Sequence, residues 1–257
     1  MRVVITHFFN EELLLPFWLR HHMELFDFGV LINHGSTDDS VDICNDLAPH
    51  WRTVNSSLEK FDAILTDFEV MDFERQFVGW KMALNVTEFL VPTRPLVEIE
   101  TALVKAGHEG CSSRGVNIVD IERKPPVNDL PLIEQYRFGF DDNSILDRSE
   151  RLRVGLPPEP NRNRFYHNCD IGAYHPGRHR SWHPDSLLRV SELQVYHFGF
   201  APWTAGFIDR KLQIASKLKR SDVEKGMGIQ HTKTRQELEQ SFNSLSGLAS
   251  RLPESRK

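Results

Sequence analysis

The sequence predicts an α/β fold whose central sheet is mixed but mainly parallel and is flanked by helices. Two observations carry this prediction. Short, apolar, β-branched runs alternate with amphipathic stretches in the first half of the chain, and this strand–helix–strand–helix order favours parallel neighbours. With 257 residues and a hydrophobic content of 40%, the chain is also long enough to bury a full core.

The first half of the predicted layer follows from local patterns. Apolar, β-branched runs predict strands, and apolar side chains recurring on one face predict helices. The strands are expected at residues 3–5 and 28–32, and the helices at residues 10–25 and 41–47. Pro16 falls in the first turn of the first helix, where its missing N–H costs nothing. Asp38 or Asp39 is a candidate cap for the second helix, and a ligand contact is an equally open interpretation for this pair.

Residues 80–92, "WKMALNVTEFLVP", combine an apolar strand pattern with polar side chains. Asn85, Thr87 and Glu88 interrupt the run, and Phe89 resumes it. A buried strand rarely carries three polar residues unless it is ending or a site requires them. This segment is therefore predicted to be a strand with a working edge.

The chain is predicted to form one domain over residues 1–231. It is followed by a C-terminal helical or partly disordered tail over residues 232–257, which is weakly apolar. Proline-rich loops, expected to be lids or a linker, and a later strand–helix pair complete the domain. The loops are residues 125–131 and 154–164, the strand begins at residue 193, and the helix covers residues 205–218.

Composition excludes several classes of function. A net charge of −5 and a pI near 6.2 argue against a nucleic-acid partner. Cys44, Cys111 and Cys169 have no CxxC spacing, so neither a disulfide framework nor a thiolate zinc site is indicated. The N-terminus lacks the apolar region of a signal peptide, and no stretch approaches the roughly 20 apolar residues of a transmembrane segment. We expect a cytoplasmic protein.

Polar clusters follow three of the predicted strands. They read "HFFNEE", "NHGSTDDS" and "NVTEF". In open α/β sheets, ligands bind beyond the carboxyl ends of the strands. One such cluster is ordinary loop chemistry, whereas three at the same edge predict a pocket.

These motifs as a set resemble those of GT-A-fold glycosyltransferases of the family-2-like kind, with later landmarks similar to bacterial members. The family has an Asn-Glu after its first strand, a Leu-Pro-x-Trp-Leu helix with a His pair, a D-N-G-S-T-D loop, and an acidic D-x-D-E-F motif. The corresponding segments here are Asn10-Glu11, "LPFWL" at residues 15–19, His21-His22, "NHGSTD" at residues 33–38, and Asn85 to Phe89.

The resemblance implies a GT-A fold and transfer of a sugar from a nucleotide-diphosphate sugar to a hydroxyl acceptor. The acceptor would be a glycan or a lipid-linked molecule, as in polysaccharide biosynthesis. The residues that match the family's donor pocket would bind substrate. These are Asn10, Glu11, Asn33, Gly35 and Asp38, with Asn85 and Thr87 beside the ribose and diphosphate, and with Arg178 and Lys211 supplying positive charge.

The D-x-D motif of this chain is degenerate. Asn85 and Thr87 stand where the family has acids that hold a divalent metal, and only Glu88 is acidic. A departing diphosphate gathers negative charge, which Mn²⁺ or Mg²⁺ with oxygen ligands would stabilise. Three outcomes are open: a metal held by Glu88, a loop Asp and His197; basic residues such as Arg178 and Lys211 in its place; or a non-catalytic nucleotide- or glycan-binding module.

Histidines crowd residues 167–183 around Cys169. They are His167, His175, His179 and His183. A structural zinc site, a loop whose Arg178 and His179 reach the pyrophosphate, and ordinary exposed loop residues are all open. An inverting transfer needs a base near the acceptor hydroxyl, and Asp170 and His179 are the candidates. His197, a metal ligand by resemblance, is equally read as a core histidine.

Overall fold

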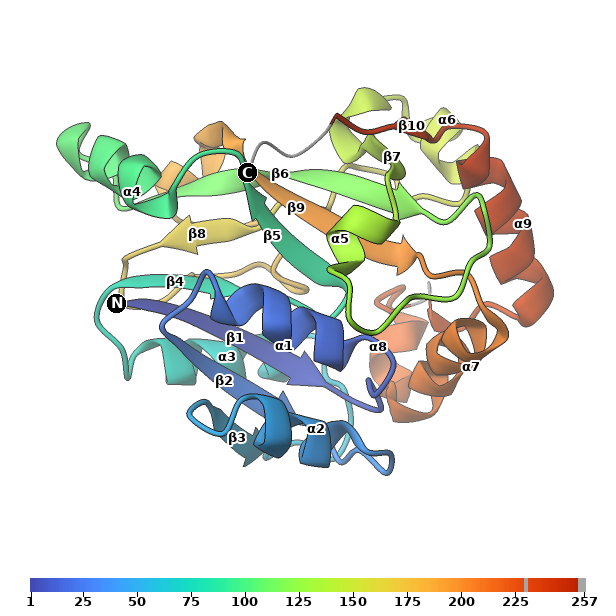
Figure 1. Ribbon diagram of the computed structural model, residues 1–257, viewed down its shortest axis with the longest axis horizontal. Coiled ribbons are helices and arrows are strands. Elements are labelled where there is room, and N and C mark those ends of the chain that lie inside the picture. Colours follow the sequence, from blue (N-terminus) through green and yellow to red (C-terminus); the bar gives the residue numbers. More distant parts are fainter. Residues whose placement is uncertain (229–230, 254–257) are drawn as a thin grey trace.

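The N-terminal half of the chain forms a parallel layer of four strands in the order β3–β2–β1–β4 (Figure 1). The computed structural model of the protein describes residues 1–228 and 231–253. The four strands are β1 (Arg2–Phe8), β2 (Phe28–Asn33), β3 (Arg52–Asn55) and β4 (Trp80–Ala83). Because they are parallel, their carboxyl ends lie at one edge of the sheet. The first two strands and this arrangement were predicted; β3 was not.

Helices cover both faces of this layer because the strand side chains alternate. On one face, Val4 and Leu31 pack in the same core cluster as Trp18 of α1 (Leu15–Met23). On the other face, Val3 and Ile5 pack with Val70 of α3 (Leu65–Glu74). α2 (Ser40–Leu47) joins the α1 side through its buried Cys44. The helices therefore bury β1, β2 and β4 on both faces.

The second half of the sheet is largely antiparallel. β8 (Phe165–His167) pairs with β4, β6 (Gly110–Val119) pairs with β8 and with β7 (Phe138–Asp141), and β10 (Ser250–Arg251) pairs with β7. β9 (Arg189–Phe200) runs parallel to β6 and antiparallel to β5 (Glu88–Pro92). The predicted α/β class with a mixed sheet is confirmed.

Residues 80–92 form two strands rather than one interrupted strand. The chain turns after β4, where the Glu88 N–H donates to the Asn85 carbonyl at 2.8 Å. It then enters β5 with Glu88 opposite His197 of β9. The polar residues thus mark a change of direction between two buried strands. α1 fixes this position, since the Trp18 indole N–H donates to the Glu88 carbonyl at 2.9 Å.

Further helices surround the sheet. They are α4 (Leu96–Lys105), α5 (Leu132–Gln135), α6 (Arg148–Arg153), α7 (Ala205–Gln213), α8 (Arg220–Glu224) and α9 (Arg235–Ser246). The expected C-terminal tail contains α9 and β10, and Phe242 of α9 stacks on Trp203. Residues 254–257 of that tail lie outside the described residues. No helix in the described part of the chain combines the length and the apolar character needed to cross a bilayer.

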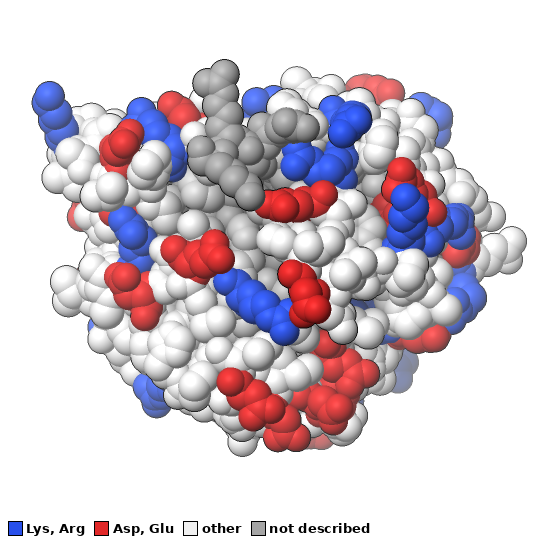
Figure 2. Space-filling model, viewed as in Figure 1, with Lys and Arg blue, Asp and Glu red and all other residues white. Residues whose placement is uncertain are grey.

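The charged side chains are mixed on the face of the molecule seen in Figure 2. Lys and Arg alternate there with Asp and Glu, as expected for a chain with a net charge of −5. The charges that matter for the site lie at the carboxyl edge of the parallel strands.

Candidate functional site

Two asparagines fasten the loops at the carboxyl ends of β1 and β2. Asn10, with φ at 51°, accepts from the Thr37 N–H at 2.8 Å. Asn33 accepts from the Ser36 N–H at 2.8 Å and donates to Asn55 at 2.9 Å. The predicted substrate residues Asn10 and Asn33 therefore lie at the same edge, and their side chains shape the loops that form it.

The remaining predicted residues of these loops have identifiable contacts. Gly35 has φ at 72°, and a Cβ there would lie 3.3 Å from Nζ of Lys217. Asp38 accepts from two backbone N–H groups, those of Ser40 and Glu12, each at 3.1 Å. Asp38 thus ties the start of α2 to the first loop, in line with the capping alternative.

The C-terminal part of the domain closes over this edge. Asn10 donates to Gln213 at 2.9 Å, and Glu11 forms a buried ion pair with Arg210 of α7. Lys217 lies over the ring of Phe9, 4.6 Å from its centroid. The strand ends, remote from α7 in sequence, therefore share one site with it.

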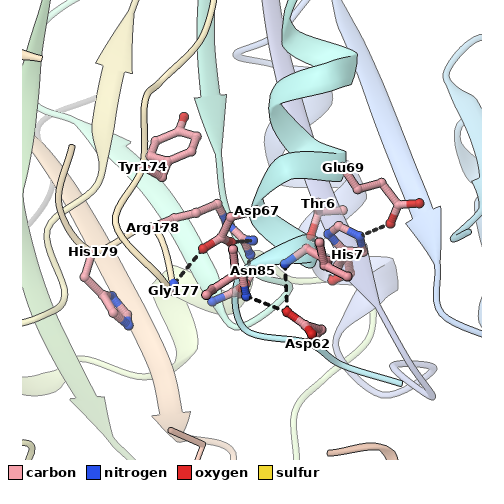
Figure 3. A network of polar contacts seen from close by, with 12 residues as sticks. Thr6, His7, Asp62, Asp67, Glu69, Asn85, Tyr174, Gly177, Arg178 and His179 are labelled. Carbon is pink, nitrogen blue, oxygen red and sulfur yellow. Dashed lines mark hydrogen bonds and ion pairs between the residues drawn. The ribbon is translucent and has the colours of Figure 1, made fainter. Parts of the chain in front are cut away.

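The turn after β4 holds a polar network (Figure 3). Arg178 donates to Oδ1 of Asn85 at 2.9 Å and forms a buried ion pair with Asp67. The Gly177 N–H donates to the other oxygen of Asp67 at 2.7 Å. The predicted residues Asn85 and Arg178 are therefore brought together, and the charge of Arg178 is neutralised by Asp67.

Glu88, the expected metal ligand, has no free oxygen. Arg164 donates to both carboxylate oxygens, at 2.8 Å to Oε2, and the Asn85 N–H donates to Oε2 at 2.9 Å. The two side chains are each 1% exposed. A metal bound here would have to displace a buried guanidinium, so the structure assigns Glu88 to an ion pair instead.

Thr87 and His197 complete the turn. The Thr87 carbonyl accepts from the Phe198 N–H at 2.7 Å, which holds the turn against β9. Nδ1 of His197 is buried and has no partner among residues 1–228 and 231–253. Burial lowers the pKa of His197 well below its usual value, and the positive charges of Arg162 and Lys211 lower it further. Those charges would repel a cation from this imidazole.

His179 lies beside the same network but is poorly suited to act as a base. Its Nδ1 contacts the Arg164 guanidinium, which can only donate. Burial and the charge of Arg164 lower the pKa of His179 well below its usual value, so the ring is neutral. The remaining proton must then be on Nε2, which makes that nitrogen a donor.

Asp170, the other candidate base, lies elsewhere. It is exposed and follows β8, and its carbonyl accepts from Nζ of Lys81 at 3.3 Å. Lys81 pairs with His167 at the amino end of β4, whereas Asn85 follows the carboxyl end of that strand. The antiparallel pairing of β8 with β4 therefore takes Asp170 to the opposite edge of the sheet.

Basic side chains adjoin the turn, and we call the partly buried Arg162, His197 and Lys211 the basic cluster. Lys211 donates to the Gly199 carbonyl at 2.9 Å, and a Cβ on Gly199 would lie 2.3 Å from the His197 ring. Arg162 packs on Gly115, the neighbour of Val195 in β9. Burial and the charges of Arg210 and Arg162 lower the pKa of Lys211 to about 7.

Arg162 is the functional candidate that the sequence did not identify. Burial lowers the pKa of its guanidinium, and its Nε is buried without a partner in the described part of the chain. Asp142, the acid bound to the Arg162 backbone N–H, is already paired with Arg151. Arg162 belongs to the loop predicted to be a lid or linker, and only its "NRNR" run gave a signal.

The histidines of residues 167–183 do not converge on one metal. His167 contacts Glu74 and Tyr174, and His175 stacks on Trp182. Within residues 1–228 and 231–253, only Cys169, His183 and Glu109 offer ligand atoms within 4.8 Å of one another. However, Nδ1 of His183 accepts from the Asp185 N–H at 3.3 Å, so a neutral ring carries its proton on Nε2, which faces Glu109 at 3.4 Å. This arrangement is a hydrogen-bonded cluster rather than a ready zinc site.

An apolar cavity of about 240 Å³ opens beside the polar network. It lies between α3 and residues 171–182 and shares Asp67 with the Arg178 ion pair. Phe68 and Trp182, which line it, are exposed by 53% and 74%. The site therefore has a basic side and an apolar side, separated by Asp67 and Arg178.

No protein-family model matches the sequence, and comparison with curated proteins gives no match. Among solved structures, S. aureus TarS 1–349 in complex with UDP-GlcNAc matches at 12% identity over 95% of this chain and 79% of that one, with a TM-score of 0.38. The structure of full S. aureus TarS matches at 12% identity over 84% and 39%, with a TM-score of 0.40.

Glucosyl-3-phosphoglycerate synthase from Mycobacterium tuberculosis, in complex with phosphoglyceric acid, matches at 13% identity over 69% of this chain and 61% of that one, with a TM-score of 0.38. The chain spans 38% to 64% of the length of the first structures that it matches. A likeness at these values carries no argument about activity, and the fold class rests on the strand order described above.

Proposed function

We propose that the chain is a glycosyltransferase that moves a sugar from a nucleotide-diphosphate sugar to a hydroxyl acceptor. One observation carries the proposal. The carboxyl ends of β1, β2 and β4 bring Asn10, Asn33 and Asn85 to one edge of the sheet, beside the basic cluster. Amide groups suit the ribose and base of a nucleotide, and positive groups suit its diphosphate. The motif resemblance points to the same substrate class.

The chemistry of such a transfer needs charge stabilisation at the leaving group. Negative charge grows on the diphosphate as the sugar departs, and fixed positive groups in a half-buried site stabilise it. The Nε2–H of His179 and the amide of Asn85 would add hydrogen bonds. We place the acceptor, a glycan or lipid-linked molecule, on the apolar side next to Phe68 and Trp182. A cytoplasmic location remains part of this proposal.

A second candidate function, a non-catalytic nucleotide- or glycan-binding module, is favoured by one observation. Three buried carboxylates near the edge, Glu11, Asp67 and Glu88, are each paired with an arginine, and a fourth, Asp62, is paired with Lys219. None of the four is therefore free to take a proton from an acceptor hydroxyl.

A donor assay tests both candidates. Calorimetric titration with UDP, GDP and their sugars would be followed by mass spectrometry of the donor after long incubation, with and without simple glycan acceptors. Binding followed by hydrolysis or transfer supports the transferase. Binding with an intact donor supports the binding module, and no binding to any nucleotide would overturn both.

A further inference from the structure

We infer that this chain binds the diphosphate of its donor without a divalent cation, and that Arg162 and Lys211 supply the positive charge that a metal ion provides elsewhere. The inference rests on the proposed function, because it concerns the same site. It departs from what the family resemblance implies, where a metal is held at the turn that follows β4.

The acidic ligands that a metal needs are already neutralised. Arg164 neutralises Glu88, Arg178 neutralises Asp67, and Arg210 neutralises Glu11. All six side chains are less than 10% exposed. Freeing one acid for a metal would leave its arginine buried and unpaired, which is strongly unfavourable. Mn²⁺ and Mg²⁺ are usually held in such sites by at least one carboxylate, and none of these three is free, so the set is a poor fit for either ion.

The amide of Asn85 is also turned the wrong way for a cation. Its Oδ1 accepts from Nη2 of Arg178 at 2.9 Å, so the donor group Nδ2 is the one left for a ligand. An N–H group repels a cation and donates to a phosphate oxygen. The position that is acidic in the resembling family is therefore an anion-binding group here.

Two positive groups with unused hydrogen-bond donors lie next to this turn. Nε of Arg162 is buried without a hydrogen bond to any described residue. Lys211 uses one of its three donors on the Gly199 carbonyl, and its Nζ lies 4.9 Å from the centroid of the Phe200 ring. Arg162 and Lys211 are both partly buried. A buried guanidinium N–H without a partner carries a desolvation cost that a phosphate group would relieve, and Lys211 has donors left for the same group. The lowered pKa values of both groups agree with this cost.

Calorimetry with inorganic pyrophosphate, UDP and GDP, each in EDTA and in Mn²⁺, tests the inference. We expect wild type to bind UDP or GDP in EDTA within about twofold of its affinity in Mn²⁺. Arg162→Gln should weaken binding about tenfold or more, because it removes a charge-assisted contact. Arg148→Gln, at an exposed arginine of α6, is the matched control and should bind like wild type. Lys211→Met is a second variant if Arg162→Gln does not fold, as judged by thermal denaturation.

The outcomes separate this inference from the proposed function. Nucleotide binding that requires Mn²⁺ would overturn the inference and leave the transferase proposal standing. Pyrophosphate binding in EDTA that is lost in Arg162→Gln, without binding of any nucleotide, would keep the anion site and overturn the donor proposal. Binding that is equal in Arg162→Gln, Lys211→Met and wild type would also overturn the inference.

Discussion

The turn at residues 85–88 lies beside the basic cluster, since Glu88 is opposite His197 in the sheet. The two regions differ in whether their buried charged groups have partners. At the turn, Glu88 is matched by Arg164 in an ion pair that is almost fully buried. In the basic cluster, Nε of Arg162 is buried without a hydrogen-bond partner among the described residues. Removing Glu88 would leave the buried Arg164 without its counter-charge, which is strongly destabilising. Burial of the Arg162 Nε without a partner already carries a desolvation free energy. The comparison teaches that Glu88 is committed to an internal ion pair, whereas the adjacent Arg162 has a buried donor without a partner in the described part of the chain.

The largest effect is expected from breaking the paired region. Glu88→Ala leaves Arg164 buried without its counter-charge and should lower the free energy of unfolding by about 3–5 kcal/mol. Urea denaturation measures this. Glu98→Ala, in an exposed ion pair with Arg94, is the matched control and should cost less than about 1 kcal/mol. Equal losses in the two variants would show that the Glu88–Arg164 pair does not form.

Asn85→Asp places an acid in the turn and so tests whether the turn or the neighbouring basic side chains determine nucleotide binding. The new carboxylate would compete with Asp67 for Arg178 and repel a diphosphate, weakening nucleotide binding in EDTA by about tenfold. Calorimetry in EDTA and in Mn²⁺ measures this change. If Mn²⁺ instead makes the variant bind nucleotide more tightly than wild type does, the turn has the geometry of a metal site, which would contradict the metal-independent binding inferred above.

The contribution of Lys211, in the basic cluster, to the free energy of unfolding should depend on pH. Lys211 has a pKa of about 7, below its ordinary 10.5, so between these values the unfolded chain binds more protons than the folded one. Its burial penalty is therefore complete below pH 7 and fades as the pH rises toward 10.5.

Lys211→Met removes that penalty. The variant should melt higher than wild type at pH 6, and the advantage should shrink by pH 10. Thermal denaturation at pH 6, 8 and 10 measures it, with the exposed Lys105→Met as the control. An advantage that grows with pH would contradict the lowered pKa.

The smallest effect is expected at the segment that closes over the strand ends. Lys219 pairs with Asp62, and their side chains are 47% and 13% exposed. Lys219→Ala should lower the free energy of unfolding by less than about 1 kcal/mol, because the Lys219 ammonium is half exposed and Asp62 keeps the backbone N–H groups of Ile64 and Leu65 as donors. A loss above about 2 kcal/mol in urea denaturation would mean that this pair anchors the closure.

Much of the fold was predictable because its signals are local. The runs at residues 3–5 and 28–32 and the helix at residues 41–47 depend on patterns within a few residues, and the structure contains them. β3 escaped prediction because only four residues form it, none of them fully buried. The two strands within residues 80–92 were read as one, since a change of direction between buried strands leaves no mark in apolar periodicity.

The candidate site was predictable only in part. Strand ends carried Asn10, Asn33 and Asn85 to one edge, as the polar clusters indicated. Asp170 was assigned to this site but lies at the other edge, because β8 runs antiparallel to β4. Arg162 was overlooked because its loop has no periodic pattern.

By itself, the sequence determined the alternation of strands and helices, the polar edge of the parallel layer and the neutral side chains at residues 85 and 87. Tertiary structure decided which charges are paired: Arg164 comes to Glu88 from 76 residues away, and Arg210 comes to Glu11 from 199 residues away. The reason is physical. Secondary structure follows from local periodicity, whereas the state of a buried charge depends on partners that only the folded chain brings within hydrogen-bonding distance.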